Sequence, residues 1–396
     1  MSVNSLKSPV LMVTYQYAPA ADGGAARQAQ RLAEGLAERG RRVGVVTARF
    51  PGSLTFEQVA GVEVHRVWAI PKPGRFSVTF LPSLVRFLLF HGRRYEIWHA
   101  HQAFYNAGLT LGLARLLDRW CVVKAASSGQ YGDLARLRRA PMGSWVRKAL
   151  RQADAVISLN AEMTDELLAA RIDSRRIHRI PNGVDCEEFF PPTQDQREMA
   201  RSRLGIRPDE VLVLYAGRLA EDTGTGIILD AWRILEQRFR AEPWTLIVAG
   251  DELRTNVYRE RGQTELRRAR FVGKVSDVRP LLQAADLLVR PSLSEGMSNI
   301  VLEAMASGLP VVGTRTGGLQ EQISAGVSGI LVAPGDPQAL AEALIALLQD
   351  DKRRLKMGSA GLLRARKEYS LASIIDAYER LYDDLAHQQP PRGGNA

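Results

Sequence analysis

Two carboxylates in one short segment carry the clearest chemical signal of this sequence. The segment is PSLSEGMSNIVLEAMASGLPVV, residues 291–312, in which Glu295 follows an expected strand and Glu303 falls inside the next expected helix. Ionised carboxylates only accept hydrogen bonds, so they suit the hydroxyl groups of a sugar. The competing interpretation is an ordinary strand–loop–helix connection that carries two surface acids.

The start of that helix adds an anion site beside the carboxylates. Ser298 or Asn299 suits the N-cap, which places the backbone N–H groups of Gly296, Met297 and Ser298 at the helix start. A helix N-terminus at the carboxyl end of a strand favours phosphate, and glycine lets the backbone approach a ligand closely. The two features together predict a site for phosphate and sugar.

The elements that position this site are expected to alternate between strand and helix along the chain. Short β-branched runs are separated by amphipathic helical stretches, which predicts parallel sheets with helices on both faces. A stretch punctuated by Pro181, Asn182, Gly183 and Pro191–Pro192 interrupts the pattern. The expected strands are Val10–Tyr15, Val43–Thr47, Ile97–Ala100, Cys121–Ala125 and Ala155–Leu159 before it, and Val211–Ala216, Trp244–Ala249, Phe271–Val272, Leu287–Arg290, Pro310–Gly313 and Ile330–Val332 after it.

This pattern predicts an α/β protein with two doubly wound, Rossmann-like domains. Such sheets bind ligands at the carboxyl ends of their strands, so two of them would face each other across a ligand cleft. We expect an N-terminal, acceptor-side domain at 1–190, a linker at 191–208, a nucleotide-sugar domain at 209–388 whose last helix is free to cross back, and a disordered tail at 389–396.

Six segments, in order along nearly the whole chain, resemble those of the retaining glycosyltransferases of family 4, which have the two-domain GT-B fold. They are PAADGG (19–24), IPNGVDCEEFFP (180–191), AGRL (216–219), FVGKVSDVRPLLQAADLLVRPSLSEG (271–296), the segment 291–312 itself, and TGGLQEQISAGVSGILVAPGDP (316–337). The resemblance implies a hexosyltransferase that uses a UDP- or GDP-linked sugar. No cluster of Asp or His has metal-ligand spacing, so neither a metal nor another cofactor is expected.

The resemblance also implies a role for each matching residue. Glu295 would hold hydroxyls of the transferred sugar, and Glu303 would hold the ribose hydroxyls. Arg218 would neutralise the diphosphate, on which charge grows as the glycosidic bond breaks, so Glu295 and Arg218 are the expected catalytic residues. The other expected donor contacts are Gly23 and Gly24, whose backbone would approach the donor phosphate or the acceptor, Val275 near the base, and the backbone N–H groups of Gly296, Met297 and Ser298.

One departure from the family pattern concerns the charge on the diphosphate. Relatives usually carry a Lys after AGRL, and this chain has Thr223 there; Arg290 in turn stands where relatives usually carry an apolar residue. An unpaired Arg at the end of a buried strand is costly. Arg290 therefore either supplies the diphosphate charge that Thr223 lacks, or pairs with a carboxylate such as Glu295, Glu321 or Asp251, or faces solvent.

A second departure follows the expected strand at 121–125. Many relatives have a His there, whereas this chain has Ser127 and Ser128, which remain candidates for contact with the sugar or the acceptor. His99 and His101 flank another strand end. They are interpreted either as a hydrogen-bonded structural pair or as a pair in which His101 reaches the ligand cleft.

The net charge of +10 is placed unevenly, because residues 81–151 hold 12 basic and 3 acidic side chains. This charge fits a solvated face, an anionic-lipid surface or a nucleic-acid surface. No nucleic-acid reader motif accompanies it, so nucleic acid is not an expected partner. The densest part of this basic region is Arg138, Arg139, Arg147, Lys148 and Arg151.

The location expected from the sequence is cytoplasmic. No run approaches about 18 consecutive apolar residues, and the N-terminus lacks the pattern of a signal peptide. The basic region leaves open a peripheral attachment to the inner face of the cell membrane.

The expected activity is retaining, metal-independent transfer of a sugar to a lipid-linked saccharide, a polysaccharide or a small molecule. A nucleotide-sugar 2-epimerase has a similar architecture, but the segment 291–312 disfavours it. A sugar-nucleotide-binding or scaffold protein with weakened catalysis is the alternative that Thr223, Ser127 and Ser128 favour.

Overall fold

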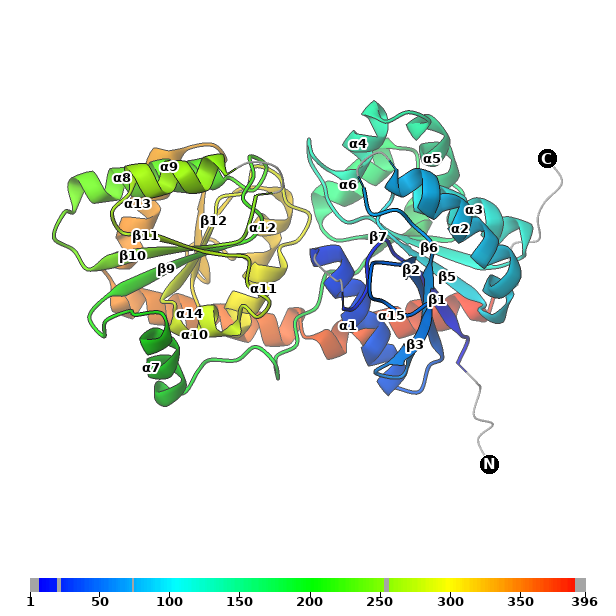
Figure 1. Cartoon of the computed structure of the whole chain (residues 1–396), viewed down its shortest axis with the longest axis horizontal. Helices are drawn as coiled ribbons and strands as arrows, with labels where there is room; N and C mark the ends of the chain where they lie inside the picture. The colour runs from blue at the N-terminus through cyan, green and yellow to red at the C-terminus, as the bar shows by residue number, and fades with distance from the viewer. Residues whose placement is uncertain (1–6, 20–22, 73–74, 253–255, 389–396) are drawn as a thin grey trace. The chain divides into compact units, whose positions relative to one another are not determined.

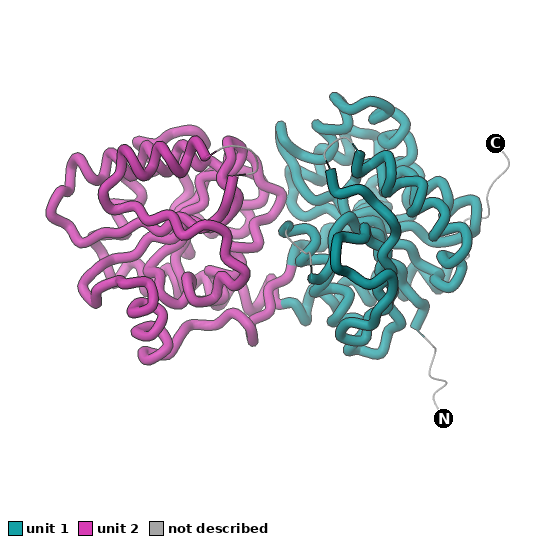
Figure 2. The backbone as a smooth tube through the Cα atoms, in the orientation of Figure 1, with its two compact units in different colours: residues 1–182, 371–396 teal, residues 183–370 magenta. Residues whose placement is uncertain are grey.

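The chain divides into two compact units. The computed structural model describes residues 7–19, 23–72, 75–252 and 256–388. Figure 1 shows the elements, and Figure 2 colours the first unit teal, with residues up to Asn182 and from Leu371, and the second unit magenta, with residues 183–370. The two doubly wound α/β units confirm the predicted fold class.

The first unit is built on a mostly parallel sheet. Its central strands are buried on both faces, which explains why they appear in the sequence as continuous apolar runs rather than alternating ones. Only the hairpin of β3 and β4 is antiparallel among the described strands. In sheet order, the strands are β3 (Phe56–Val59), β4 (Val62–Val67), β2 (Val43–Ala48), β1 (Val10–Val13), β5 (Ile97–His101), β6 (Trp120–Lys124), β7 (Ala155–Ser158) and β8 (Ile177–Arg179).

Helices cover this sheet and pack their apolar faces against it. The α1 helix, for example, buries Leu32 and Leu36, four residues apart and hence on one face. The helices of the first unit are α1 (Gly24–Glu38), α2 (Phe76–His91), α3 (Tyr105–Leu116), α4 (Asp133–Arg139), α5 (Gly143–Leu150), α6 (Ala161–Ala169) and α15 (Leu371–Ala386), with short 3-10 turns at Gly92–Arg94 and Ser174–Arg176.

The second unit is a parallel sheet in which the strand order reverses between β9 and β12. Ligands of such sheets bind where the order reverses, at the carboxyl ends of the strands. In sheet order, the strands are β11 (Ala269–Gly273), β10 (Trp244–Ala249), β9 (Val211–Ala216), β12 (Leu287–Arg290), β13 (Val311–Thr314) and β14 (Gly329–Val332). The helices are α7 (Gln194–Arg203), α8 (Thr225–Arg238), α9 (Val257–Glu265), α10 (Arg279–Ala284), α11 (Asn299–Ala306), α12 (Gly317–Gln322), α13 (Pro337–Leu348) and α14 (Asp351–Glu368).

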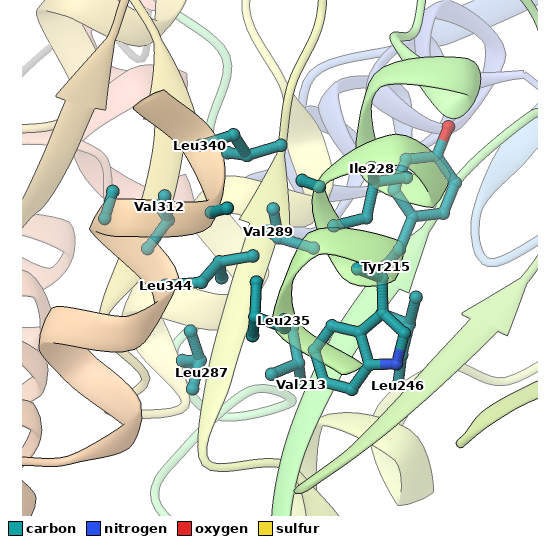
Figure 3. Close-up of a cluster of buried hydrophobic side chains, with 14 of the residues drawn as sticks. Val213, Tyr215, Ile228, Leu235, Leu246, Leu287, Val289, Val312, Leu340 and Leu344 are labelled. Atoms are coloured by element: carbon teal, nitrogen blue, oxygen red, sulfur yellow. The ribbon is translucent and has the colours of Figure 1, made fainter. Parts of the chain in front are cut away.

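The core of the second unit lies between this sheet and the helices on one of its faces. Figure 3 shows Val213, Leu287 and Val289 from the strands packed against Leu235 and other helical side chains. Their burial is complete, so this packing fixes the sheet that carries the loops after β9, β12 and β13.

The boundary between the units lies at residues 182–183, before the expected linker, and the expected linker segment contains α7. Arg201 of α7 donates to the carbonyl of Ala284, which attaches this segment to the second unit. The α15 helix returns to the first unit, where it packs beside α1 and buries Tyr378 and Tyr382 in the core. The expected tail at 389–396 lies outside the described residues.

Candidate functional site

Three loops meet at the carboxyl edge of the second unit's sheet, after β9, β12 and β13. Two glycines permit their close packing. A Cβ on Gly224 would lie 1.8 Å from the carbonyl oxygen of Pro291, and one on Gly318 would lie 2.1 Å from that of Gly296. Since no other residue fits at these two positions without displacing backbone, the loops are held together as one surface.

Glu295 lies in the loop after β12 and is held by the strand that precedes it. Its Oε2 atom accepts from Arg290, at 3.1 Å from Nε and 2.7 Å from Nη2, and from the Ser292 hydroxyl at 3.2 Å. The Arg290 side chain is 10% exposed and that of Glu295 is 17% exposed. Burial opposes the charge on Arg290, but nearby Glu295 outweighs it and raises the pKa of Arg290.

This contact confirms the ion pair that was one of the interpretations of Arg290. The third guanidinium nitrogen, Nη1, lies 3.5 Å from the carbonyl oxygen of Ala216, at the end of neighbouring β9. The guanidinium is therefore at the ligand-binding edge of the sheet. A direct role for Arg290 toward a diphosphate stays a prediction.

Arg218 follows β9 in the loop that faces the same edge. Its side chain is 42% exposed and donates to Asp222 at 2.6 Å. The hydroxyl of Thr223, by contrast, is turned into its own loop, with the carbonyl oxygens of Arg218 and Ala220 at 2.9 and 2.8 Å. Thr223 is 7% exposed, so its side chain stabilises the loop, and its contact with a donor stays a prediction.

The helix that begins after Glu295 is α11, and Ser298 is its N-cap residue, as expected. The backbone N–H of Ser298 is bonded to Oε1 of Gln322 at 3.0 Å, and Nε2 of Gln322 donates to the Ser298 carbonyl at 2.8 Å. The contact of this N–H with a donor stays a prediction, and it would compete with the bond to Gln322. Gln322 anchors the helix start, a role that sequence reasoning missed because 23 residues separate the two positions.

Four other residues that were expected to contact the donor lie in or beside α11 and in the loop after β11. Gly296 and Met297 precede the N-cap, with Met297 buried, and Glu303 lies within α11 at 3% exposure. Val275 lies in the loop after β11 and is half-buried. Their contacts with a nucleotide sugar stay predictions.

In the first unit, Gly23 is the N-cap of α1 and Gly24 is its first residue, after the loop that follows β1. Among the described residues, no group of three or more His, Cys, Asp or Glu side chains is arranged to hold a metal ion.

His99 and His101 form a buried pair with ring centroids 4.2 Å apart, and Nδ1 of His99 lies 2.7 Å from the Tyr382 hydroxyl. Burial lowers the pKa of His99 well below its usual value and that of His101 to about 3, so both rings are neutral near pH 7. These contacts support the structural interpretation of the pair. At 2% exposure His101 is hidden from a ligand, so its predicted contact would require this packing to open.

Lys124, at the end of β6, is a buried cation that sequence reasoning missed. Its Nζ atom donates to Oδ1 of Asn182 at 2.9 Å and lies 5.7 Å from the centroid of the Tyr378 ring. Burial lowers the pKa of Lys124 to about 7. We therefore expect the stability of the first unit to depend on pH.

Ser127 and Ser128 donate their hydroxyls to carboxylates of their own unit. Ser127 Oγ lies 3.0 Å from Asp133 Oδ1, and Ser128 Oγ lies 3.0 Å from Glu162 Oε2. Ser128 is fully buried. Their predicted contact with a sugar or an acceptor would compete with these bonds.

The sequence matches two family models. Residues 22–188 match Glycosyltransferase Family 4, and residues 210–350 match Glycosyl transferases group 1. A D-inositol 3-phosphate glycosyltransferase of Corynebacterium urealyticum is 30% identical over 90% of this chain and 89% of its own length. An alpha-maltose-1-phosphate synthase of Mycobacterium tuberculosis is 29% identical over 61% of this chain and 66% of its own length.

Solved structures share the fold over nearly the whole chain. Anabaena HepE, crystallised with UDP and glucose, has a TM-score of 0.78 at 20% identity and covers 96% of this chain and 100% of its own. WaaG, a glycosyltransferase involved in lipopolysaccharide biosynthesis, has a TM-score of 0.76 at 21% identity and covers 94% and 99%. With these matches and the loops assembled around Glu295, the chain belongs to glycosyltransferase family 4 and is a glycosyltransferase of the GT-B fold.

Proposed function

We propose that this protein transfers a hexose from a UDP- or GDP-sugar to a saccharide, lipid-linked or small-molecule acceptor. The observation that carries the proposal is the surface at the edge of the second sheet, where Glu295 is fixed by Arg290 and Ser292 beside the start of α11. Anabaena HepE was crystallised with UDP and with UDP-glucose, which supports a UDP-sugar as the first donor to test.

The transfer proceeds with retention of configuration and without a metal. The acceptor oxygen forms a bond to the anomeric carbon as the bond from that carbon to the diphosphate oxygen breaks. The acceptor proton passes to the leaving oxygen on the same face of the sugar. Arg218, on its exposed loop, stabilises the charge that develops on the diphosphate.

Glu295 accepts hydrogen bonds from hydroxyls of the transferred sugar. The guanidinium of Arg290 and the hydroxyl of Ser292 hold one oxygen of this carboxylate, Oε2, in place. Preorganised groups of this kind contribute to the rate because they need no rearrangement as the bond breaks.

A panel of nucleoside diphosphates and nucleotide sugars, followed by the melting temperature, tests the donor. A ligand present at 100 times its dissociation constant stabilises its protein by about 2.7 kcal/mol. We expect UDP or GDP, and at least one of their hexose conjugates, to raise the melting temperature. A panel without any stabilising member would contradict the proposal.

A second candidate is a protein that binds nucleotide sugars but turns them over weakly. It is favoured by the Thr223 hydroxyl, which is engaged within its loop where relatives supply a lysine charge. Consumption of the donor in the absence of an acceptor separates the two candidates, because a weakened protein binds the donor and leaves it intact.

We also propose that the α4–α5 region docks on an anionic membrane at the cytoplasmic face. Met142, between the two helices, is 71% exposed and Trp145 is 40% exposed, and basic side chains surround them in the sequence. Apolar side chains enter the lipid interface while cations bind its headgroups. No helix within the described part of the chain is long and apolar enough to cross a membrane. The basic side chains are Arg138, Arg139, Arg147, Lys148 and Arg151.

A further inference from the structure

One buried carboxylate ties together two loops at the carboxyl edge of the first unit's sheet. Asp133 is the first residue of α4 and is 6% exposed. Its Oδ2 atom accepts from the backbone N–H of Ala103, at 3.2 Å, and of Ala126, at 2.8 Å, while Oδ1 accepts from the Ser127 hydroxyl at 3.0 Å. Ala103 follows β5 and Ala126 follows β6, so Asp133 fixes the spacing of the two strand ends.

Two carboxylates of α6 hold the same loop from the neighbouring strand. Glu162 accepts from the Ser128 hydroxyl at 3.0 Å, and Glu166 accepts from the backbone N–H of Gly129 at 2.7 Å. The α6 helix follows β7 in the chain. The ends of β5, β6 and β7 are therefore connected through the loop at residues 125–132.

Of these three carboxylates, Asp133 is buried, Glu166 is half-buried and Glu162 is exposed. Burial raises the pKa of Asp133 and of Glu166 above their usual values, although their hydrogen-bond donors oppose the shift. Charge-assisted bonds to backbone N–H groups are about twice as strong as neutral ones, so the loop is held more rigidly than a turn requires. The loop lies at the carboxyl edge of the sheet, which is the edge at which doubly wound sheets bind their ligands.

The loop turns tightly, and its most exposed residue, Gln130, lies at its tip. A Cβ on Gly132 would lie 2.8 Å from the carbonyl oxygen of Ser127, so the chain folds back closely there. Gln130 is exposed and Tyr131 is half-buried, whereas Ser128 is fully buried. An amide and a phenol ring are suited to a saccharide, because the amide donates and accepts hydrogen bonds and the ring packs on the sugar face.

We propose that Asp133 is a positioning residue that holds Gln130 and Tyr131 against the saccharide part of the acceptor. This inference rests on the proposed transfer reaction. It assigns acceptor recognition to the tip of the loop at 125–132, and it assigns the half-buried Ser127 and the buried Ser128 to holding that loop.

The control is Asp154, a half-buried carboxylate beside the same strand. Asp154 accepts from the backbone N–H of Cys121 at 2.8 Å, at the amino end of β6, and burial raises its pKa as well. Asp133→Asn and Asp154→Asn therefore make the same chemical change at opposite ends of β6. Both are expected to lower the melting temperature.

Initial rates at varied acceptor concentration and calorimetric affinity for UDP distinguish the two variants. We expect Asp133→Asn to raise the acceptor KM roughly 10-fold, as loss of a charge-assisted bond implies, and Asp154→Asn to leave it within about 2-fold. Asp133→Glu should recover less than full function, because its longer side chain shifts the bonded loops. The affinity for UDP should stay unchanged in all three variants.

Gln130→Ala and Tyr131→Ala test the loop tip without changing Asp133, so they separate acceptor recognition from a general folding defect. Each should raise the acceptor KM. In Gln130→Ala the melting temperature should stay within about 1 °C, because Gln130 is exposed and surface substitutions rarely change stability much. An unchanged acceptor KM in Asp133→Asn, or in both Gln130→Ala and Tyr131→Ala, overturns the positioning role. The proposed function still holds in that case if the wild-type protein transfers a sugar. A wild-type chain that binds no nucleotide sugar and transfers none overturns both.

Discussion

Replacement of Arg290 by Met provides a sharp test of the site. The Arg290–Glu295 pair is buried, with 10% and 17% of the two side chains exposed, and removal of one partner leaves the other uncompensated. Breaking a buried pair in this way costs about 3–5 kcal/mol. Since Glu295 also accepts from Ser292, we expect the lower end, about 3 kcal/mol.

The consequence for unfolding follows from the size of the second unit. For a domain of 150–250 residues, 1 kcal/mol shifts the melting temperature by roughly 2–4 °C, so about 3 kcal/mol corresponds to roughly 6–12 °C. Glu295→Gln should cost a similar amount, because it leaves the Arg290 charge buried. The double variant should cost less than the sum of the two single variants, as expected for groups in direct contact.

Calorimetry with UDP and differential scanning calorimetry are run on five proteins: the wild type, Arg290→Met, Glu295→Gln, the double variant and Arg290→Met/Thr223→Lys. In our account Arg290→Met lowers stability and turnover, because Glu295 is no longer fixed, while the affinity for UDP stays within about 2-fold. Adding Thr223→Lys rescues nothing. A fall of 10-fold or more in UDP affinity that Thr223→Lys restores would refute this reasoning and show that Arg290 acts on the diphosphate.

Three further predictions address other parts of the molecule. Acidification from pH 6.5 to 5 should lower the melting temperature, because the pKa of His101 is about 3 in the folded chain and near 6.5 when unfolded; each pH unit then costs about 1.4 kcal/mol, and His101→Gln should flatten the dependence. Glu303→Ala should weaken the affinity for the free nucleoside diphosphate while Glu295→Ala chiefly lowers turnover, and unchanged affinity in Glu303→Ala, measured by calorimetry, would show that the ribose assignment is wrong. Sedimentation with anionic vesicles should carry down the wild type at low salt but not Arg147→Ser/Lys148→Ser, since each basic group near the surface contributes ~1 kcal/mol, and equal binding to neutral vesicles would exclude this surface.

The sheets could be predicted from sequence because their central strands are buried on both faces and appear as uninterrupted apolar runs. The β3–β4 hairpin was missed because its strands alternate; Phe56 of β3 is half exposed and neighbours polar residues. The α15 helix belongs to the first unit because Tyr378 and Tyr382 are buried in that unit's core. Amphipathic spacing predicts a helix here, but it does not specify which of the two sheets the helix packs against.

In the candidate site, too, features that are local in sequence could be predicted, and contacts between distant residues could not. Glu295 and the start of α11 are local in sequence, so the segment at 291–312 predicts them. The bonds between Gln322 and Ser298, and between Asp133 and Ala103, join residues that only the order of parallel strands brings together. Ser128 was expected to contact a ligand because its loop follows a strand. Its hydroxyl instead binds Glu162, a partner 34 residues along the chain that the sequence pattern does not indicate.

The most direct test of the proposed reaction is proton NMR of the protein incubated with UDP- and GDP-hexoses and a saccharide acceptor in the presence of EDTA. Our account predicts that one donor is consumed without added metal and that the new glycosidic bond has the same anomeric configuration as the donor. Inverted configuration in the product, or dependence of turnover on a divalent cation, would contradict the proposed mechanism.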